Sequence, residues 1–270
     1  MTTFKTGWYP GTSNHDHHRG IYKDCIGSSF LKTFADRSPA HARESVLNQP
    51  DPTPAMNIGS AFHSIATGAP EEVAVIPSDI NRRTKDGKEQ YAAFELDAVG
   101  KYIISKGDHA NILAMVEALH HHPIAKNLME FKDRELTGIF QDFGTNLWCK
   151  IRPDLIDHEQ RIIVDLKSTT DASVDVFNRD IFKYGYHISA AWYKYGAEQI
   201  TGKRYAFRIV AVEKSPPYGI NCFNITGLAT RKAWEKISNI TGDLADCVKN
   251  DRWPNYKPFL HEPDVPGWVM

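Results

Sequence analysis

The chain has 270 residues, a net charge of −1 and a hydrophobic content of 41%, values that fit one large globular domain or two small ones. Its apolar runs are too short to cross a bilayer and its N-terminus lacks an apolar signal core, so we expect neither a membrane protein nor a secreted one. The balanced charge argues against a uniformly basic DNA-binding surface but is compatible with a local basic channel.

The cysteines lie far apart in the sequence, and no two form a CxxC pair. They are Cys25, Cys149, Cys222 and Cys247. A disulfide framework, a zinc knuckle or an iron–sulfur cluster would need closer grouping. We therefore expect free thiols in a reducing cytoplasm, which would be the host cytoplasm for a phage-encoded protein.

The first half of the chain is predicted to be mainly helical. In chain order we expect an extended segment over 1–27, a short helix within 27–45, a helix over 56–68, a charged loop over 77–90, and helices over about 88–105 and 108–121. Ser28 or Ser29 is placed to cap the first helix, and Gly68 is placed to end the second.

In the middle of the chain the pattern changes to short segments rich in β-branched, aromatic and apolar residues. They predict strands within 134–142, 146–157 and 161–169, and Asn146 and Asp157 mark turns between them. We expect an antiparallel meander that leads into a buried strand.

The remaining elements alternate between helix and strand. They are a helix over 187–202, strands within 204–214 and 219–226, a long amphipathic helix over 227–250 and an irregular tail over 251–270. This order predicts an α/β fold with a helical N-terminal layer. We expect one domain over 28–250, made of that layer (28–130), a catalytic core (131–226) and the last helix, between an N-terminal segment (1–27) and the tail (251–270).

The stretch RIIVDLKS places charged residues on the most apolar predicted strand. Because side chains alternate along a strand, Asp165 and Lys167 share a face and Leu166 points away. Asp154, in the preceding segment RPDLID, can converge on the same point. Burying such groups is costly unless they pair or bind a cation.

These residues suit phosphodiester hydrolysis. Two carboxylates and a backbone oxygen match the ligand preference of Mg²⁺, which can polarise a phosphoryl oxygen and acidify a bound water. Lys167 can orient that water and offset charge that develops on the phosphate. The alternative is a structural Asp–Lys ion pair at a strand end. The adjacent Pro153–Asp154 pair, and the short separation from Asp165, favour the catalytic interpretation.

A longer series of segments resembles the RecE-type phage exonucleases of the PD-(D/E)xK nuclease superfamily. The segments are SSFLKTFADRSPAH, PTPAMNIGSAFHSIATG, RRTKDGKEQYAAF, CKIRPDLID, IIVDLKSTTDAS and KYGYHISAAWYKYG, and they keep the family's order over residues 28–202. A lone DxK is a weak signal, whereas this ordered series is specific. The resemblance implies a restriction-endonuclease-like α/β core with a central mixed sheet flanked by helices.

The resemblance also assigns roles to particular residues. The implied metal ligands are His63, Asp154, Asp165 and the carbonyl of Leu166, and the implied catalytic residues are Asp154, Asp165, Lys167 and Tyr193. Glu135 matches an acidic position on the first strand of the core, although a solvated edge residue is the alternative. Ser189 stands where the family carries a glutamine, whose amide is longer and has two polar ends.

Several residues are candidates for contact with DNA phosphates. They are Ser28, Arg82, Arg83, Lys150 and Arg152. Lys150 and Arg152 add positive charge to the strand that precedes Asp154, which suits a phosphate-facing groove. The structural alternatives are a helix cap for Ser28 and a solvated charged surface for the two loop arginines.

The resemblance implies a Mg²⁺-dependent exonuclease, with Mn²⁺ as a plausible substitute, that degrades one strand of linear duplex DNA from its 5′ end and leaves a 3′ tail for phage-type recombination. It implies a single-strand annealing protein as partner and a ring-shaped homo-oligomer, with a tetramer as the candidate size. Two alternatives stay open. One is a related single-strand or repair-type nuclease, and the other is a DNA-binding module with reduced catalysis.

Overall fold

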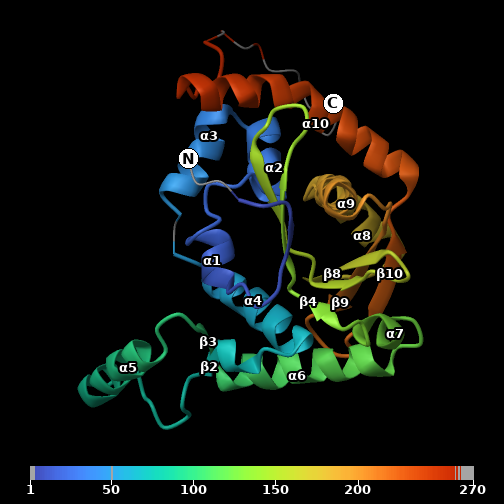
Figure 1. The fold of residues 1–270 in the computed structure, drawn as a ribbon. Coiled ribbons are helices and arrows are strands. Elements are labelled where there is room, and N and C mark those ends of the chain that lie inside the picture. The colour runs from blue at the N-terminus through green and yellow to red at the C-terminus, as the bar shows by residue number, and fades with distance from the viewer. Residues whose placement is uncertain (1–3, 50, 259, 261, 263–270) are drawn as a thin grey trace.

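The computed structural model describes residues 4–49, 51–258, 260 and 262. The fold is a mixed α/β structure in which helices cover both faces of a five-stranded sheet, which confirms the predicted fold class (Figure 1). In Figure 1 the long helices α6 (Lys106–His121) and α10 (Gly227–Asn250) lie at opposite sides of the molecule. No helix among these described residues is long and apolar enough to cross a membrane.

The five-stranded sheet has the order β10-β9-β8-β7-β4. Its strands are β4 (Asp133–Arg134), β7 (Leu155–Asp157), β8 (Ile162–Thr169), β9 (Ala206–Glu213) and β10 (Ile220–Asn224). β8 and β9 pair in parallel and the other neighbours are antiparallel. The parallel pairing is possible because α8 (Val174–Lys183) and α9 (Tyr186–Thr201) connect the two strands.

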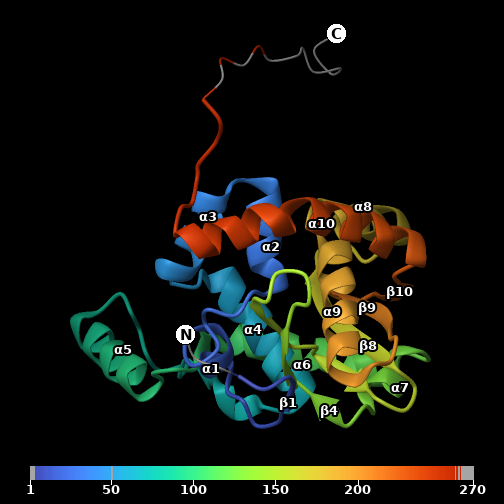
Figure 2. The same ribbon diagram turned by 45° about the horizontal axis from the view of Figure 1, so that its top comes forward.

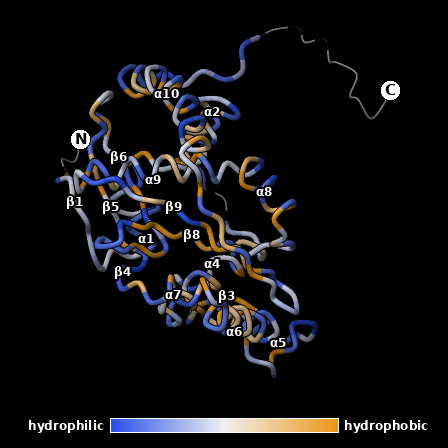
Figure 3. Tube along the Cα trace, turned by 90° about the vertical axis from the view of Figure 1, so that its right-hand side faces the viewer, coloured by the Kyte–Doolittle hydropathy of each residue, from blue (hydrophilic) through white to orange (hydrophobic). Residues whose placement is uncertain are grey.

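Alternate residues of β8 enter two different hydrophobic cores. Figure 3 colours the chain trace by the hydropathy of each residue. Ile163 packs in the core that contains residues of α8 and α9, whereas Val164 and Leu166 pack in the core that contains residues of α6. Asp165 and Lys167 therefore share the face of Ile163, and Leu166 points to the opposite face, as the strand alternation predicts.

A second sheet corrects the expectation of one continuous meander. It has the order β1-β5-β6 and contains β1 (Gly7–Tyr9), β5 (Thr137–Gln141) and β6 (Trp148–Ile151). The chain leaves this sheet after β6 and enters the five-stranded sheet at β7. Pro153 lies at this crossing and has no N–H for a ladder hydrogen bond, so the strand cannot continue through it.

The N-terminal segment is more ordered than predicted. Besides β1 it forms the short helix α1 (Asn14–His18), which begins at the N-cap Ser13. β1 was not recognised because its stability comes from pairing with β5, which lies about 130 residues later in the sequence.

The predicted helix within 27–45 is two helices, α2 (Ser28–Asp36) and α3 (Pro39–Leu47). Ser38 caps α3 with its hydroxyl, and Pro39 starts that helix because its fixed φ and missing N–H suit a first position. The N-cap of α2 is Gly27, so neither Ser28 nor Ser29 caps the helix as predicted.

The region from 69 to 131 also differs from prediction. α4 (Pro54–Thr67) ends at the left-handed Gly68 as expected, but the helix placed over 88–105 is α5 (Lys85–Asp97) followed by β3 (Tyr102–Ile104). β3 pairs in parallel with β2 (Val73–Val75), which follows the 3₁₀ turn Pro70–Glu72. The short helix α7 (Ala125–Met129) completes the region after α6.

Residues 76–101 form a projecting segment that we call the arm. It begins and ends at the β2–β3 pair and contains α5, which stands apart from the body of the molecule in both Figure 1 and Figure 2. Residues 259, 261 and 263–270 of the predicted irregular tail lie outside the described residues. The prediction can therefore be compared with the structure mainly over 251–258. Within that part, Trp253 packs edge-on against Phe30 of α2.

Gly196 lets α9 approach the second sheet closely. A Cβ atom at this position would lie 2.6 Å from Phe140 and 3.0 Å from Ile151. We predict that Gly196→Ala destabilises the protein by roughly 1–3 kcal/mol, because the added methyl group overpacks this interface. The matched control is Gly242→Ala in α10, where the added group meets open space and should stabilise the helix by roughly 0.5–1 kcal/mol. Urea denaturation measures both, and equal effects would contradict the close packing.

Candidate active site

Charged residues from four parts of the chain line one cavity of about 250 Å³. The residues predicted from the sequence that line it are His63, Glu135, Arg152, Asp154, Asp165, Lys167 and Tyr193. α4 supplies the histidine, the junctions beside β4 and β7 supply Glu135 and Asp154, β8 supplies Asp165 and Lys167, and α9 supplies the tyrosine. The fold therefore brings together groups that are up to 130 residues apart in sequence.

Asp154 is fixed by two hydrogen-bonding partners. Its Oδ2 atom accepts a hydrogen bond of 2.6 Å from the backbone N–H of Leu166 and lies 3.2 Å from His63 Nδ1. Burial alone would raise the pKa of Asp154, but His63 and the other partners outweigh burial and lower it. Burial likewise opposes protonation of His63, yet the Asp154 carboxylate raises the histidine pKa. The carboxylate is thus held ionised at the cavity.

Asp165 and Lys167 form the ion pair that their spacing predicts. The Lys167 Nζ atom lies 2.5 Å from Asp165 Oδ2 and donates to the Leu166 carbonyl at 3.2 Å. The ammonium group also lies over the ring of Tyr186, 5.2 Å from its centroid. Burial would lower the pKa of Lys167, but Asp165 and Asp154 raise it, so the group is a cation at neutral pH.

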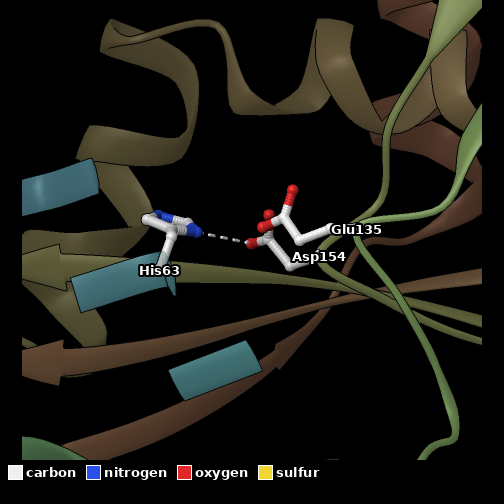
Figure 4. A group of neighbouring side chains, drawn as sticks. All are labelled: His63, Glu135 and Asp154. Carbon is white, nitrogen blue, oxygen red and sulfur yellow. Dashed lines mark ion pairs between the residues drawn. The ribbon is translucent and has the colours of Figure 1, made fainter. Parts of the chain in front are cut away.

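Glu135 completes an acidic group with His63 and Asp154. One ligand atom from each of the three residues lies within 4.8 Å of the others, and their side chains point toward one another in Figure 4. Burial and the charge of Asp154 raise the pKa of Glu135 to about 7. Glu135 was predicted from the resemblance as an acidic residue near the site, and the structure places it there rather than at a solvated edge.

The donor set fits a divalent cation that prefers oxygen and nitrogen ligands. His63 offers an imidazole nitrogen, and Glu135 and Asp154 offer carboxylate oxygens at distances that one ion can bridge. Asp165 lies outside this trio and its carboxylate pairs with Lys167, although it lines the same cavity. The carbonyl of Leu166, the remaining predicted ligand, accepts a hydrogen bond from the Lys167 ammonium.

Two residues of α9 have different surroundings. Tyr193 lines the cavity, and burial raises the pKa of its hydroxyl, which is therefore neutral. Ser189 is buried and donates to the hydroxyl of Ser28 at 3.3 Å. Ser28 and Ser189 meet where α2 packs against α9. Ser28 also lines a second, smaller cavity, and Tyr193 lines that cavity too.

The basic candidates do not form one exposed groove. Lys150 is buried, and its ammonium donates to the carbonyls of His17 and Tyr22 at 2.6 and 2.9 Å, which satisfies it inside the protein. Burial lowers its pKa to about 8. Its side chain is therefore structural in this conformation and does not face a phosphate groove as predicted.

The other basic candidates also have specific surroundings. Arg152 pairs with Glu135 Oε2 at 3.2 Å, and only 10% of its side chain is exposed. Arg82 and Arg83 are exposed at the start of the arm, where Arg82 stacks on the ring of Tyr91 at 4.9 Å. Sequence reasoning therefore placed these two correctly on an exposed charged loop.

Some residues that line the cavity were not recognised from the sequence. They are Asn14, His17, His18, Ser60, Ser64, Glu72 and Tyr102. No local motif marks them, since they come from the N-terminal segment, from α4, from the 3₁₀ turn before β2 and from the start of β3. The helical spacing of Ser60, His63 and Ser64 was the available signal, because residues three and four apart share one helix face.

Comparison with known proteins identifies the family. Residues 27–257 match the family described as a PDDEXK-like domain of unknown function, DUF3799. The chain belongs to this PDDEXK-like family. The sequence-based resemblance to the PD-(D/E)xK superfamily is thereby confirmed. A search of curated proteins gave no match.

Two solved structures are similar to this chain to different degrees. A candidate exonuclease from Eubacterium rectale superposes with a TM-score of 0.67 at 16% identity and covers 95% of this chain and 97% of its own. A phage-related exonuclease from Haemophilus somnus matches at 12% identity over 84% of this chain and 96% of its own, with a TM-score of 0.36. At 16% identity, the similarity to the Eubacterium rectale structure supports the fold of this chain.

The raised pKa of Glu135 predicts a pH-dependent stability of the protein without metal. Between about pH 4.5 and about pH 7 the folded state keeps a proton that the unfolded state loses, so the free energy of unfolding falls as pH rises. Glu135→Gln removes this titration. We expect the variant to gain on the order of 3 kcal/mol relative to wild type across that range. Urea denaturation in EDTA measures the difference, with the exposed Glu235→Gln as control, and a difference that does not vary with pH would contradict the assignment.

Proposed function

We propose that the chain is a metal-dependent deoxyribonuclease that hydrolyses phosphodiester bonds at the ends of linear duplex DNA. The observation that supports it is the convergence of Asp154, Asp165 and Lys167 with His63 and Glu135 in one cavity of a PDDEXK-like fold. Hydrolysis of a phosphodiester needs a positioned water, a cationic group near the phosphate and stabilisation of the leaving oxygen. The cavity offers groups for each of these tasks.

Lys167 has the best-defined role in this proposal. Its ammonium is a cation at the cavity wall, so it can donate to the attacking water or to a non-bridging phosphate oxygen as negative charge develops. Asp165 and the Leu166 carbonyl orient the ammonium, which removes much of the freedom of a long side chain. Tyr193, neutral and facing the same cavity, can donate a hydrogen bond to a phosphate oxygen.

His63, Glu135 and Asp154 would hold the metal, with Asp165 and the Leu166 carbonyl beside them. A bound Mg²⁺, or Mn²⁺ in its place, would polarise the phosphoryl oxygen and lower the pKa of a bound water. Protein groups orient the three side chains, because Leu166 N–H fixes Asp154, Asp154 orients His63 and Arg152 pairs with Glu135. Preorganisation of this kind lowers the cost of assembling the reactive groups.

The finer proposals concern substrate and partners. We propose degradation from the 5′ end that leaves 3′ tails for phage-type recombination, a single-strand annealing protein as partner, a ring-shaped homo-oligomer and a cytoplasmic location. They are supported by the sequence resemblance. The description of the Eubacterium rectale protein as an exonuclease bears only on exonuclease action. In this proposal residues 28–250 form the nuclease domain.

Lys167→Ala tests the assignment of the site. We expect degradation of linear duplex DNA in Mg²⁺ to fall by about 100-fold or more, because the cation beside the phosphate is lost. Lys203→Ala, an exposed lysine before β9, is the matched control and should keep wild-type activity. EDTA should abolish the activity of all three proteins. Equal degradation by wild type and Lys167→Ala would show that the assigned cavity is not the active site.

The same assay distinguishes the proposed activity from its alternatives. Early release of a 5′ label from one strand of the duplex supports the proposed polarity, whereas early release of a 3′ label reverses it. Preference for single-stranded DNA indicates a single-strand or repair-type nuclease. Binding of duplex ends without cleavage in Mg²⁺ or Mn²⁺ indicates a DNA-binding module.

The arm is the proposed route of the DNA to the site. Four basic residues and one acidic residue lie within 82–88, and Tyr102, at the end of the arm, lines the cavity. We predict that the double variant Arg82→Ala/Arg83→Ala weakens duplex binding in EDTA and reduces the slope of log K against log salt by about 1–2, since each phosphate contact contributes roughly 0.9. The control is Lys203→Ala/Arg204→Ala, which changes two consecutive exposed basic residues before β9. An unchanged slope would exclude phosphate contacts by the arm.

A further inference from the structure

Arg152 connects the acidic site to the N-terminal segment. Its Nε atom donates to the carbonyl of Glu135 at 3.0 Å and lies 3.2 Å from the Glu135 carboxylate, while Nη1 donates to Asn14 Oδ1 at 2.6 Å. The guanidinium is thus engaged on two sides by protein groups, and only 10% of its side chain is exposed. The Nε and Nη1 atoms of Arg152 therefore hold the guanidinium between Glu135 and Asn14.

Glu135 needs such support because its backbone is strained. Its φ of 47° lies in the left-handed region, which non-glycine residues seldom adopt and which costs on the order of 1 kcal/mol or more. Both of its backbone polar groups are held in place, since its N–H donates to the Asp154 carbonyl at 3.0 Å and its carbonyl accepts from Arg152. This conformation directs the carboxylate toward His63 and Asp154.

Asn14 holds Arg152 from the other side. It is the first residue of α1, and its side-chain amide donates to the hydroxyl of Tyr102 at the base of the arm. α1 is fixed in turn by Lys150, whose ammonium binds the carbonyls of His17 and Tyr22. Asn14 lies before residue 27, where the match to the PDDEXK-like family begins. A segment outside the family domain therefore contacts the acidic site through one hydrogen-bonded chain.

We propose that Arg152 is a positioning residue that sets the location of the Glu135 carboxylate for a divalent cation, and that Asn14 of the N-terminal segment orients Arg152. The proposal rests on the metal-dependent function proposed above. It differs from the sequence-based expectation that Arg152 contacts a DNA phosphate. In the positioning role the effect of Arg152 passes through Glu135, whereas a phosphate contact would act on DNA affinity directly.

Mn²⁺ binding to the DNA-free protein, followed by the electron paramagnetic resonance signal of free Mn²⁺, tests the proposal. Arg152→Lys keeps the positive charge but loses the planar fork that reaches two partners, and Asn14→Ala removes the support without changing charge. We expect each variant to bind Mn²⁺ about 10-fold or more weakly, the range that loss of a residue supporting a metal ligand produces. The exposed neighbours Arg179→Lys and Asn178→Ala on α8 are matched controls and should bind as wild type.

A double-variant cycle isolates the route through Glu135. If Arg152 acts by positioning that carboxylate, Arg152→Lys should have no further effect on Mn²⁺ affinity in a Glu135→Gln background. Thermal denaturation confirms that each variant is folded, and Asn14→Ala serves as the second test should Arg152→Lys fail to fold.

Three results would overturn the inference. Folded variants with wild-type Mn²⁺ affinity, and with weaker duplex binding in EDTA and a smaller salt slope, would show that Arg152 is a phosphate contact. Equal losses of Mn²⁺ affinity in the wild-type and Glu135→Gln backgrounds would show that Arg152 acts independently of Glu135. Failure of the wild-type protein itself to bind Mn²⁺ would instead reject the metal-dependent function, and this inference with it.

Discussion

The ion pair between Asp165 and Lys167 is the interaction on which the candidate site depends. Both groups lie on a strand that is apolar on its opposite face, so each would be costly to bury alone. Paired at 2.5 Å, they leave a cation at the wall of a cavity whose other charges are mainly acidic. The strand register fixes this pair, because a shift by one residue would turn both side chains into the hydrophobic core of Leu166.

The site forms where two sheets meet. Residues 152–154 carry the chain from β6 to β7. Arg152 pairs with Glu135, Pro153 prevents the strand from continuing, and Asp154 pairs with His63. The same crossing brings the backbone of Glu135 against that of Asp154. The positions of Glu135 and Asp154 therefore depend mainly on the connection 152–154 and less on the surrounding helices.

The sequence predicted the parts of this arrangement that depend on local pattern. Strand alternation placed Asp165, Leu166 and Lys167 correctly, and α10 and the end of α4 at Gly68 agree with their sequence signals. Local pattern could not show that β3 ends the region predicted as a helix, since pairing with β2 decides this. The break between α2 and α3 did have a local signal, the cap Ser38 followed by Pro39. It also could not show that Lys150 is satisfied by carbonyls from the N-terminal segment. No sequence motif marks Asn14, so its hydrogen bond with Arg152 could be found only from the structure.

The parallel pairing of β8 with β9 has a consequence for the order in which the molecule assembles. These strands are separated by the whole of α8 and α9, and β1 must find β5 across an even longer stretch of chain. Contacts between segments so distant in sequence form late and slow the search for the native state. The cavity also needs groups from Asn14 to Tyr193. A nascent or partly folded chain therefore lacks the complete candidate site, which can form only when synthesis and folding have passed beyond α9.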